Sequence, residues 1–319
     1  MGDHGRKKGK LIVKKIMIDC DVGVDDAFAL ILAFRSPELE VKAVTGVNGN
    51  VPLEQVFINI RKVLSLIQPP AKPLIAKGAA RPLKGEPLYA HSVHGLDGLG
   101  GARIAQSEGE TWWEIFPGHG DDLILEMARR YPGEMTLIAI GPLTNLALAF
   151  QKDVEGMKKL KEVVVMGGAI RTGGNTTPYA EFNFFSDPLA AKVVFESGLP
   201  VTLVPLDVTH QVFFTPQWVE KRLQPVNNPF SRFIIDATGY NMETHQFQGK
   251  DLIYLHDPLA VGAVMDPNLM RKELLSLRVE TREGDQYGRI LEVKGASKIE
   301  VCLGVDADRF FDLFLSRLA

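Results

Sequence analysis

Short, continuous runs of apolar residues recur along the first part of the chain, and a segment with helical periodicity follows most of them. Continuous runs, rather than alternating ones, are typical of strands buried on both faces of a sheet. The predicted strands are Ile16–Ile18, Val41–Val44, Met135–Ile140, Val163–Met166 and Val201–Val204. The predicted helices are Asp26–Phe34, Leu53–Ile67, Asp121–Arg130 and Asp187–Glu196. This alternation predicts an α/β fold in which helices flank a mostly parallel central sheet.

The pattern changes after the last of these strands. Pro216–Gln224 and Phe230–Gln246 have helical periodicity with no strand between them, which predicts a helical cap beside the sheet. The alternating runs Arg289–Val293 and Lys298–Val305 predict an antiparallel edge of the sheet. An amphipathic helix over Asp306–Leu318 is predicted to close the chain.

Composition narrows the class of protein. Of the 319 residues, 45% are hydrophobic and 24% are charged, as in an ordinary globular protein. No linker rich in proline, glycine or serine is present, so we expect one domain over 11–319 after a mobile basic arm over 1–10. The formal net charge of −3 does not favour nucleic acid or an anionic membrane as a partner. No apolar run approaches the ~20 residues of a membrane span. The distant cysteines Cys20 and Cys302 fit reduced thiols in a cytoplasmic protein.

The loops that follow the strands are the places to search for chemistry, because the ligand site of a parallel sheet lies at the carboxyl ends of its strands. The first such loop holds four carboxylates, those of Asp19, Asp21, Asp25 and Asp26. Like charges this close repel one another unless a cation or hydrogen-bond donors offset them, and carboxylates without histidine or cysteine suit Ca²⁺ or Mg²⁺. Two alternatives remain. Asp25 and Asp26 cap the next helix, or Asp19 is the phosphorylated nucleophile of a haloacid-dehalogenase-like phosphatase.

Three later loops carry further polar residues. They are Thr45–Asn50 after the second strand, the segment from Met166 to Asn183 with Asn175 and Glu181, and His256-Asp257-Pro258 at the start of a helix. Each one alone is an ordinary turn or helix cap. The three loops together point to one kind of site more specifically than any single loop does.

Together these motifs resemble the inosine-uridine-preferring nucleoside hydrolase family. In that family the first strand is followed by Asp-x-Asp-Pro-Gly-x-Asp-Asp, and residues 19–26 here have Val22 in place of the proline. This departure affects the rigidity of the turn and no ligand. The resemblance continues in the expected order over nearly the whole chain, through Gly49-Asn50, His94-Gly95, Gly141–Asn145, Met166–Gly168, Glu181–Asn183 and His256–Pro258. The run Asp207–His210 also resembles one typical of the family, without a chemical role that we can assign.

The resemblance implies an enzyme that hydrolyses the N-glycosidic bond of ribonucleosides to ribose and a free nucleobase, a reaction of nucleoside salvage. It implies one Ca²⁺ held by the carboxylates of Asp21, Asp26 and Asp257 and by the main-chain carbonyl of Ile140. Water bound to Ca²⁺ stays mostly undissociated at neutral pH, so a carboxylate base is needed beside it. Asp21 is the candidate for that base.

The remaining motif positions imply contacts with the substrate. Asp25, Asn50, Asn175, Glu181 and Asn183 match positions that bind the ribose end of the nucleoside, and Met166 matches one that lines the pocket. A transition state with oxocarbenium character is expected at the ribose.

Two histidines are expected near the nucleobase. His256 is the candidate acid that protonates the leaving base, because an imidazole titrates near neutral pH. His94 is expected beside the base, either as a second donor or only as part of the pocket wall.

Three other functions remain as alternatives to ribonucleoside hydrolysis. A phosphatase needs a distal aspartate pair, for which Asp121-Asp122 is the available match, although it fits a helix start better. A ligand-binding protein without catalysis is expected to lack a metal ligand or the base, and none is lacking. A hydrolase of the same fold acting on a modified nucleoside is the third, since specificity depends on the loops around 80–100 and 225–255. The pair of histidines favours the inosine-uridine or cytidine-uridine type, and the family resemblance implies a homodimer or homotetramer.

Overall fold

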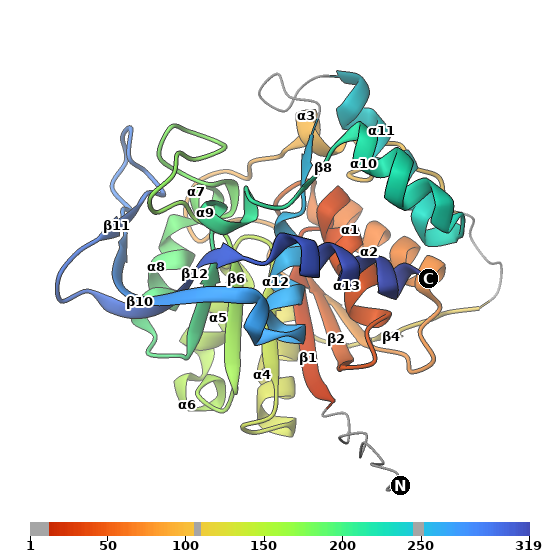
Figure 1. Ribbon diagram of the computed structural model, residues 1–319. Coiled ribbons are helices and arrows are strands. Elements are labelled where there is room, and N and C mark those ends of the chain that lie inside the picture. Colours follow the sequence, from red (N-terminus) through yellow and green to blue (C-terminus); the bar gives the residue numbers. More distant parts are fainter. Residues whose placement is uncertain (1–12, 105–109, 245–251) are drawn as a thin grey trace, which may run out of the picture.

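Figure 1 shows the computed structural model of the chain, which describes residues 13–104, 110–244 and 252–319. A central sheet stands between two layers of helices, as expected for the α/β class. The basic arm predicted over residues 1–10 lies outside the described residues. Within them, no helix is long and apolar enough to cross a membrane.

The central sheet has ten strands in the order β11-β10-β12-β7-β6-β5-β1-β2-β3-β4. They are β1 (Lys14–Cys20), β2 (Leu39–Gly46), β3 (Leu74–Lys77), β4 (Glu114–Ile115), β5 (Thr136–Ala139), β6 (Glu162–Met166), β7 (Val201–Val204), β10 (Met270–Val279), β11 (Ile290–Glu292) and β12 (Ser297–Val305). The strands from β12 to β4 pair in parallel, whereas β10 is antiparallel to both of its neighbours. The chain order reverses between β1 and β5, and a cleft forms at such a switch point.

Two helical layers cover the two faces of the sheet. One layer contains α1 (Val24–Phe34), α2 (Leu53–Ile67), α11 (Pro229–Thr244), α12 (His256–Met265) and α13 (Ala307–Leu318). The other contains α4 (Gly120–Arg130), α5 (Thr144–Lys152), α6 (Val154–Met157) and α8 (Pro188–Glu196). Ile16 and Ile18 of β1 pack into the first core and Met17 into the second, which is why this strand is apolar at consecutive positions.

Short elements surround the carboxyl ends of the strands, at the top of Figure 1. They are α3 (His91–His94), α7 (Phe182–Ser186), α9 (Leu206–Thr209), α10 (Pro216–Trp218) and the two-stranded sheet of β8 (Phe213–Phe214) and β9 (Ile253–Tyr254). A π-helical turn (Val219–Leu223) and 3-10 turns (Gln224–Val226 and Pro267–Leu269) complete the structure.

The predicted elements agree with the structure in type and differ in detail. The predicted helix over 216–224 is α-helical only in its first residues and continues as a π-helical turn. The predicted end of the next helix, at Gln246, lies outside the described residues. The antiparallel edge is confirmed, but its longest strand, β10, was not predicted, because Lys and Arg interrupt its apolar positions.

The packing of α13 generates a stability prediction. Phe314 is fully buried on this helix, whereas Ile58 on α2 is partly exposed. Phe314→Ala leaves a cavity between α13 and the first core, so we expect a loss of about 3–5 kcal/mol in the free energy of unfolding. Urea denaturation measures it, with Ile58→Ala as the control that should cost less than about 1 kcal/mol. Equal losses in the two variants would contradict the described burial.

Candidate active site

A cleft opens at the carboxyl ends of the strands, at the switch point between β1 and β5. It encloses about 940 Å³, including the space at its open mouth. Its lining includes ten of the predicted site residues: Asp25, Asn50, His94, Ile140, Met166, Asn175, Glu181, Asn183, His256 and Asp257. The other two, Asp21 and Asp26, are fully buried and do not line it.

The loop between β1 and α1 folds around Asp26. The Asp26 carboxylate accepts hydrogen bonds from the backbone N–H groups of Gly23 (2.8 Å) and Asp21 (3.1 Å). Asp26 lies in the first turn of α1, where unpaired N–H groups and the helix dipole favour a negative charge. The helix-cap interpretation of this residue is therefore correct, and it does not compete with a role at the cleft floor.

The loop after β2 is bonded to the same carboxylates. The backbone N–H of Asn50 donates to Asp21 Oδ2 at 2.7 Å, and its side-chain amide donates to Asp26 Oδ2 at 3.1 Å. A Cβ on Gly49 would lie 2.0 Å from Asp21 Oδ2, so only glycine permits this approach. The Gly49-Asn50 motif thus places the Asp21 carboxylate.

Four carboxylates meet at the floor of the cleft. Oxygen atoms of Asp25, Asp26 and Asp257 lie within 4.8 Å of one another. Burial, followed by repulsion from Asp26, raises the pKa of Asp21 well above its usual value and that of Asp25 to about 8. Burial, followed by repulsion from Asp25, likewise raises the pKa of Asp257. Protonation or a bound cation would offset the repulsion among these carboxylates.

The donor set fits a hard cation. All the candidate ligand atoms are oxygens, which suits Ca²⁺. Asp21 Oδ1 is buried without a hydrogen-bond partner in the described part of the chain. It lies close to the start of the loop after β5, since a Cβ on Gly141 would be 3.0 Å from it. Asp25, rather than Asp21, lies in the close group of oxygens with Asp26 and Asp257, and Asp21 is linked to Asp26 by its backbone N–H.

Asn183 on α7 joins two neighbouring strand ends. Its side-chain amide donates to the carbonyl oxygens of Ile140 (3.0 Å) and Met166 (3.2 Å). The carbonyl of Ile140, the predicted main-chain ligand, is thereby held in place at a residue that lines the cleft.

Glu181 has a structural role beside its place in the cleft. Its carboxylate caps α7 by accepting from the backbone N–H groups of Asn183 (2.8 Å) and Phe184 (3.1 Å), and it also accepts from Gly168 at 2.8 Å. Asn175 lies in the exposed loop before it and accepts a hydrogen bond from the Phe182 N–H at 2.9 Å.

The two predicted histidines line the same cleft as Asp25 and Asp257. Nδ1 of His94 accepts a hydrogen bond from the backbone N–H of Val24 at 3.0 Å, so Nε2 carries the proton of the neutral ring. Burial lowers the pKa of His94 to about 4 and, with smaller contributions from His210 and His94, that of His256 to about 3. Burial therefore favours the uncharged form of both rings.

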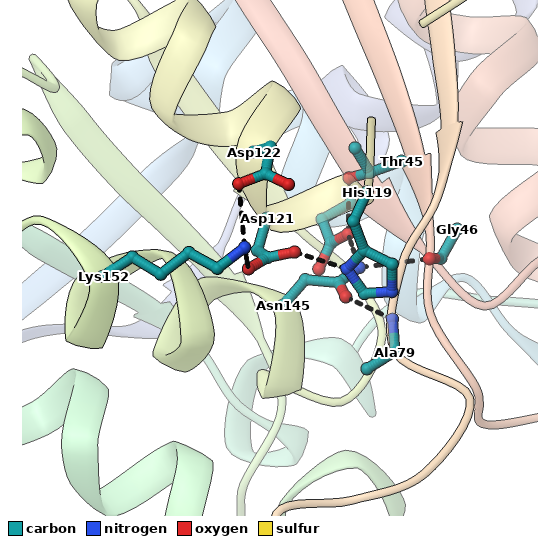
Figure 2. A network of polar contacts seen from close by, with 9 residues as sticks. Thr45, Gly46, Ala79, His119, Asp121, Asp122, Asn145 and Lys152 are labelled. Atoms are coloured by element: carbon teal, nitrogen blue, oxygen red, sulfur yellow. Dashed lines mark hydrogen bonds and ion pairs between the residues drawn. The ribbon is translucent and has the colours of Figure 1, made fainter. Parts of the chain in front are cut away.

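A polar network lies behind the acidic loop (Figure 2). The Asn145 amide donates to Asp19 Oδ1 (2.8 Å) and to the Gly46 carbonyl (3.1 Å), and its oxygen accepts from the Ala79 N–H (2.7 Å). The Thr45 hydroxyl also donates to Asp19. Burial raises the pKa of Asp19 to about 7, and these two donors partly offset it. One side chain of α5 thus ties together the ends of β1, β2 and β3.

Asp19 and the Asp121-Asp122 pair do not form a phosphatase site. Asp19 is fully buried and does not line the cleft. Asp121 and Asp122 lie in the first turn of α4 and pair with Lys152, as Figure 2 shows.

Several cleft residues were missed by sequence reasoning. Tyr254 and Ile253 on β9, with Val24, Ala90, Val93, Thr176 and Phe182, also line the cleft. Tyr254 packs against His256, with ring centroids 5.4 Å apart. Its position two residues before the His256-Asp257 motif was the available signal, but it lies in the loop region that has no readable periodicity.

The fold and the site define a nucleoside hydrolase. A solved plant nucleoside hydrolase, PpNRh1, matches the structure with a TM-score of 0.87 at 32% identity, over 96% of this chain and 98% of that one. A purine-preferring ribonucleoside hydrolase from Gardnerella vaginalis matches with a TM-score of 0.87 at 30% identity, over 96% and 98%.

Comparisons of the sequence point to the same family as the solved structures do. The profile described as "Inosine-uridine preferring nucleoside hydrolase" matches residues 16–312. The pyrimidine-specific ribonucleoside hydrolase RihA of Salmonella gallinarum is 35% identical, over 95% of this chain and 97% of its own length. RihA of Klebsiella pneumoniae is 36% identical, over 95% and 98%.

The chain therefore belongs to the inosine-uridine preferring nucleoside hydrolase family. It is an N-ribohydrolase that cleaves ribonucleosides to ribose and a free base, and the phosphatase alternative is excluded.

The close approach at Gly49 generates a prediction. In Gly49→Ala the new methyl group overlaps the Asp21 carboxylate, which must move. We expect kcat/KM for ribose release to fall about 100-fold, because small displacements of a reacting group are this costly. Gly239→Ala is the matched control, since a Cβ there meets nothing within 4 Å. A Gly49→Ala enzyme as active as this control would contradict the placement of Asp21.

Proposed function

We propose that this chain is a calcium-dependent ribonucleoside hydrolase whose cleft floor binds the metal and the ribose and whose histidine wall binds the nucleobase. The observation that carries the proposal is the group of buried carboxylates at the floor. Oxygen atoms of three of them lie within 4.8 Å of one another, and Asp21 Oδ1 has no hydrogen-bond partner among the described residues.

The proposed ligands of Ca²⁺ are Asp21, Asp26, Asp257 and the Ile140 carbonyl. When bound, Ca²⁺ orients the attacking water and the ribose diol and offsets the charge of the carboxylates. Asp25 belongs to the same oxygen cluster and faces the cleft, so it is placed to accept a hydrogen bond from a ribose hydroxyl.

Asp21 is the proposed base. Its Oδ2 is held by the Asn50 N–H, while Oδ1 has no partner among the described residues and is the proposed acceptor of a proton from the attacking water. As the bond to the base lengthens, positive charge develops on the ribose ring, and the acidic floor stabilises it.

The proposed ribose contacts come from Asn50, Asn175, Glu181 and Asn183, with Met166 against the sugar. All five line the cleft. The backbone bonds that fix Glu181 and Asn183 hold these side chains in place before the substrate arrives, which lowers the entropic cost of binding in the reactive geometry.

His256 is the proposed donor to the leaving base, with His94 as a second donor beside it. The electrons of the N-glycosidic bond move into the base as it departs. A hydrogen bond from an imidazole N–H stabilises the negative charge that develops there.

The metal and base assignments can be tested together. We expect a calcium chelator to abolish ribose release from the purified protein and added Ca²⁺ to restore it. We expect Asp21→Asn to lower kcat about 100- to 10,000-fold, as loss of a general base does. Asp285→Asn, in an exposed loop, is the control. Full activity in the chelator, or in Asp21→Asn, would exclude the corresponding role.

We further propose that the preferred bases are pyrimidines. The RihA relatives at 35% and 36% identity are named pyrimidine-specific, and the purine-preferring structural relative is 30% identical. A pyrimidine carries a carbonyl oxygen next to its glycosidic nitrogen, where an imidazole N–H can donate.

The preference can be measured by ranking kcat/KM for uridine, cytidine, inosine, adenosine and guanosine. We expect uridine and cytidine to exceed the purine nucleosides by about tenfold or more. A higher value for inosine or guanosine would overturn the pyrimidine preference. Activity on none of the five would indicate a modified nucleoside as the substrate.

The proposal extends to the whole protein. We propose a single hydrolase domain over 11–319 that forms a homodimer or homotetramer in the cytoplasm. Exposed apolar side chains such as Leu96 (82%) and Leu274 (64%) support self-association. Two buried free thiols, Cys20 and Cys302, fit a reducing compartment.

A further inference from the structure

Thr209 contacts His256 without lining the cleft. It is the last residue of α9, is fully buried, and places its hydroxyl oxygen 2.7 Å from Nδ1 of His256. Both residues are held by their backbones. The Thr209 N–H donates to the Pro205 carbonyl, and Leu255, just before His256, donates to the Val212 carbonyl at 3.0 Å. The contact is therefore built into the junction of α9, β9 and α12.

The contact joins the Thr209 hydroxyl to Nδ1 of His256, and which of the two atoms donates depends on the tautomer of the ring. A threonine hydroxyl has one hydrogen to donate. In the described part of the chain, the only hydrogen-bond partner of the Thr209 hydroxyl is His256 Nδ1. When the hydroxyl donates to Nδ1, the hydrogen of the neutral ring lies on Nε2. Nε2 is buried and has no partner among the described residues, and the ring lines the cleft.

His94 has the same Nε2–H tautomer, but the donor to its Nδ1 is a different kind of group. Nδ1 of His94 accepts from the backbone N–H of Val24, which also leaves the hydrogen on Nε2. The bond at His94 comes from the main chain, and no side-chain substitution removes it. The bond at His256 depends on one hydroxyl group.

We propose that Thr209 is a positioning residue that fixes the Nε2–H tautomer of His256 and so makes this ring a hydrogen-bond donor to the departing nucleobase. The inference rests on the proposed function, in which His256 serves the leaving base. Without the hydroxyl, the ring also populates the Nδ1–H tautomer, which presents a lone pair to the base instead of a hydrogen.

The test compares two leaving groups. A nucleoside needs help at its base, whereas the nitrophenolate of a para-nitrophenyl riboside departs as a stable anion and needs no donor. Thr209→Val replaces the hydroxyl by a methyl group of similar size. We expect kcat for the preferred nucleoside to fall about 10- to 100-fold with little change in KM, and the nitrophenyl riboside to be hydrolysed within about threefold of the wild-type rate. Thr209→Ser keeps the hydroxyl and should recover most of the nucleoside activity.

Thr202→Val is the matched control. Thr202 is a buried threonine on β7 whose hydroxyl bonds to Glu162 and Glu300, and it does not line the cleft. We expect it to stay within about twofold of wild type on both substrates. If Thr209→Val lost both substrates equally, or neither, the tautomer role would be overturned.

His256→Ala separates this inference from the proposed function. If it kept full kcat on nucleosides, His256 would not serve the leaving base. The proposed roles of His256 and Thr209 would then both be wrong. If it lost nucleoside activity while Thr209→Val did not, only the role of Thr209 would fall.

A readout independent of activity is the ¹⁵N spectrum of the histidine side chains. The wild-type spectrum should show His256 as the Nε2–H tautomer, and the Thr209→Val spectrum should show a mixture. An unchanged tautomer in Thr209→Val would overturn the proposal.

Discussion

Four aspartate carboxylates are gathered at one end of the sheet, at the switch point between β1 and β5, and their mutual repulsion in a buried site is the constraint on which the rest depends. The protein partly offsets this repulsion with backbone N–H groups from Gly23, Asp21 and Asn50. These donors do not pair with every carboxylate oxygen, since Asp21 Oδ1 has no partner among the described residues, and the cluster is compatible with the proposed cation site.

The sheet makes this arrangement possible because it fixes the strand ends in register. Asn145 ties Asp19, Gly46 and Ala79 to one another, and Asn183 ties Ile140 to Met166. Amide side chains suit this task, since each both donates and accepts and carries no charge of its own. The acidic loop is thus supported from behind and from the side by neutral groups.

The two histidines that line the cleft differ from its aspartates in charge. Burial lowers the pKa of His94 and His256, which favours uncharged rings, and in the proposed function such rings serve the base through an N–H rather than through positive charge. A charged floor and a neutral, hydrogen-bonding wall match the two halves of a nucleoside, whose sugar becomes positive and whose base becomes negative as the bond breaks.

The sequence by itself determined the α/β class, most of its elements and many, but not all, of the residues that line the cleft. Strand runs such as Ile16–Ile18 and polar motifs such as residues 19–26 are local, and their position at strand ends fixes their side of the sheet. Only the tertiary structure decided the contacts made by residues distant in sequence. Tyr254 and Thr209 reach His256 through the packing of β9, α9 and α12, and no local pattern encodes that packing. The protonation state of the histidines also depended on it, because burial, and not residue type, sets the pKa.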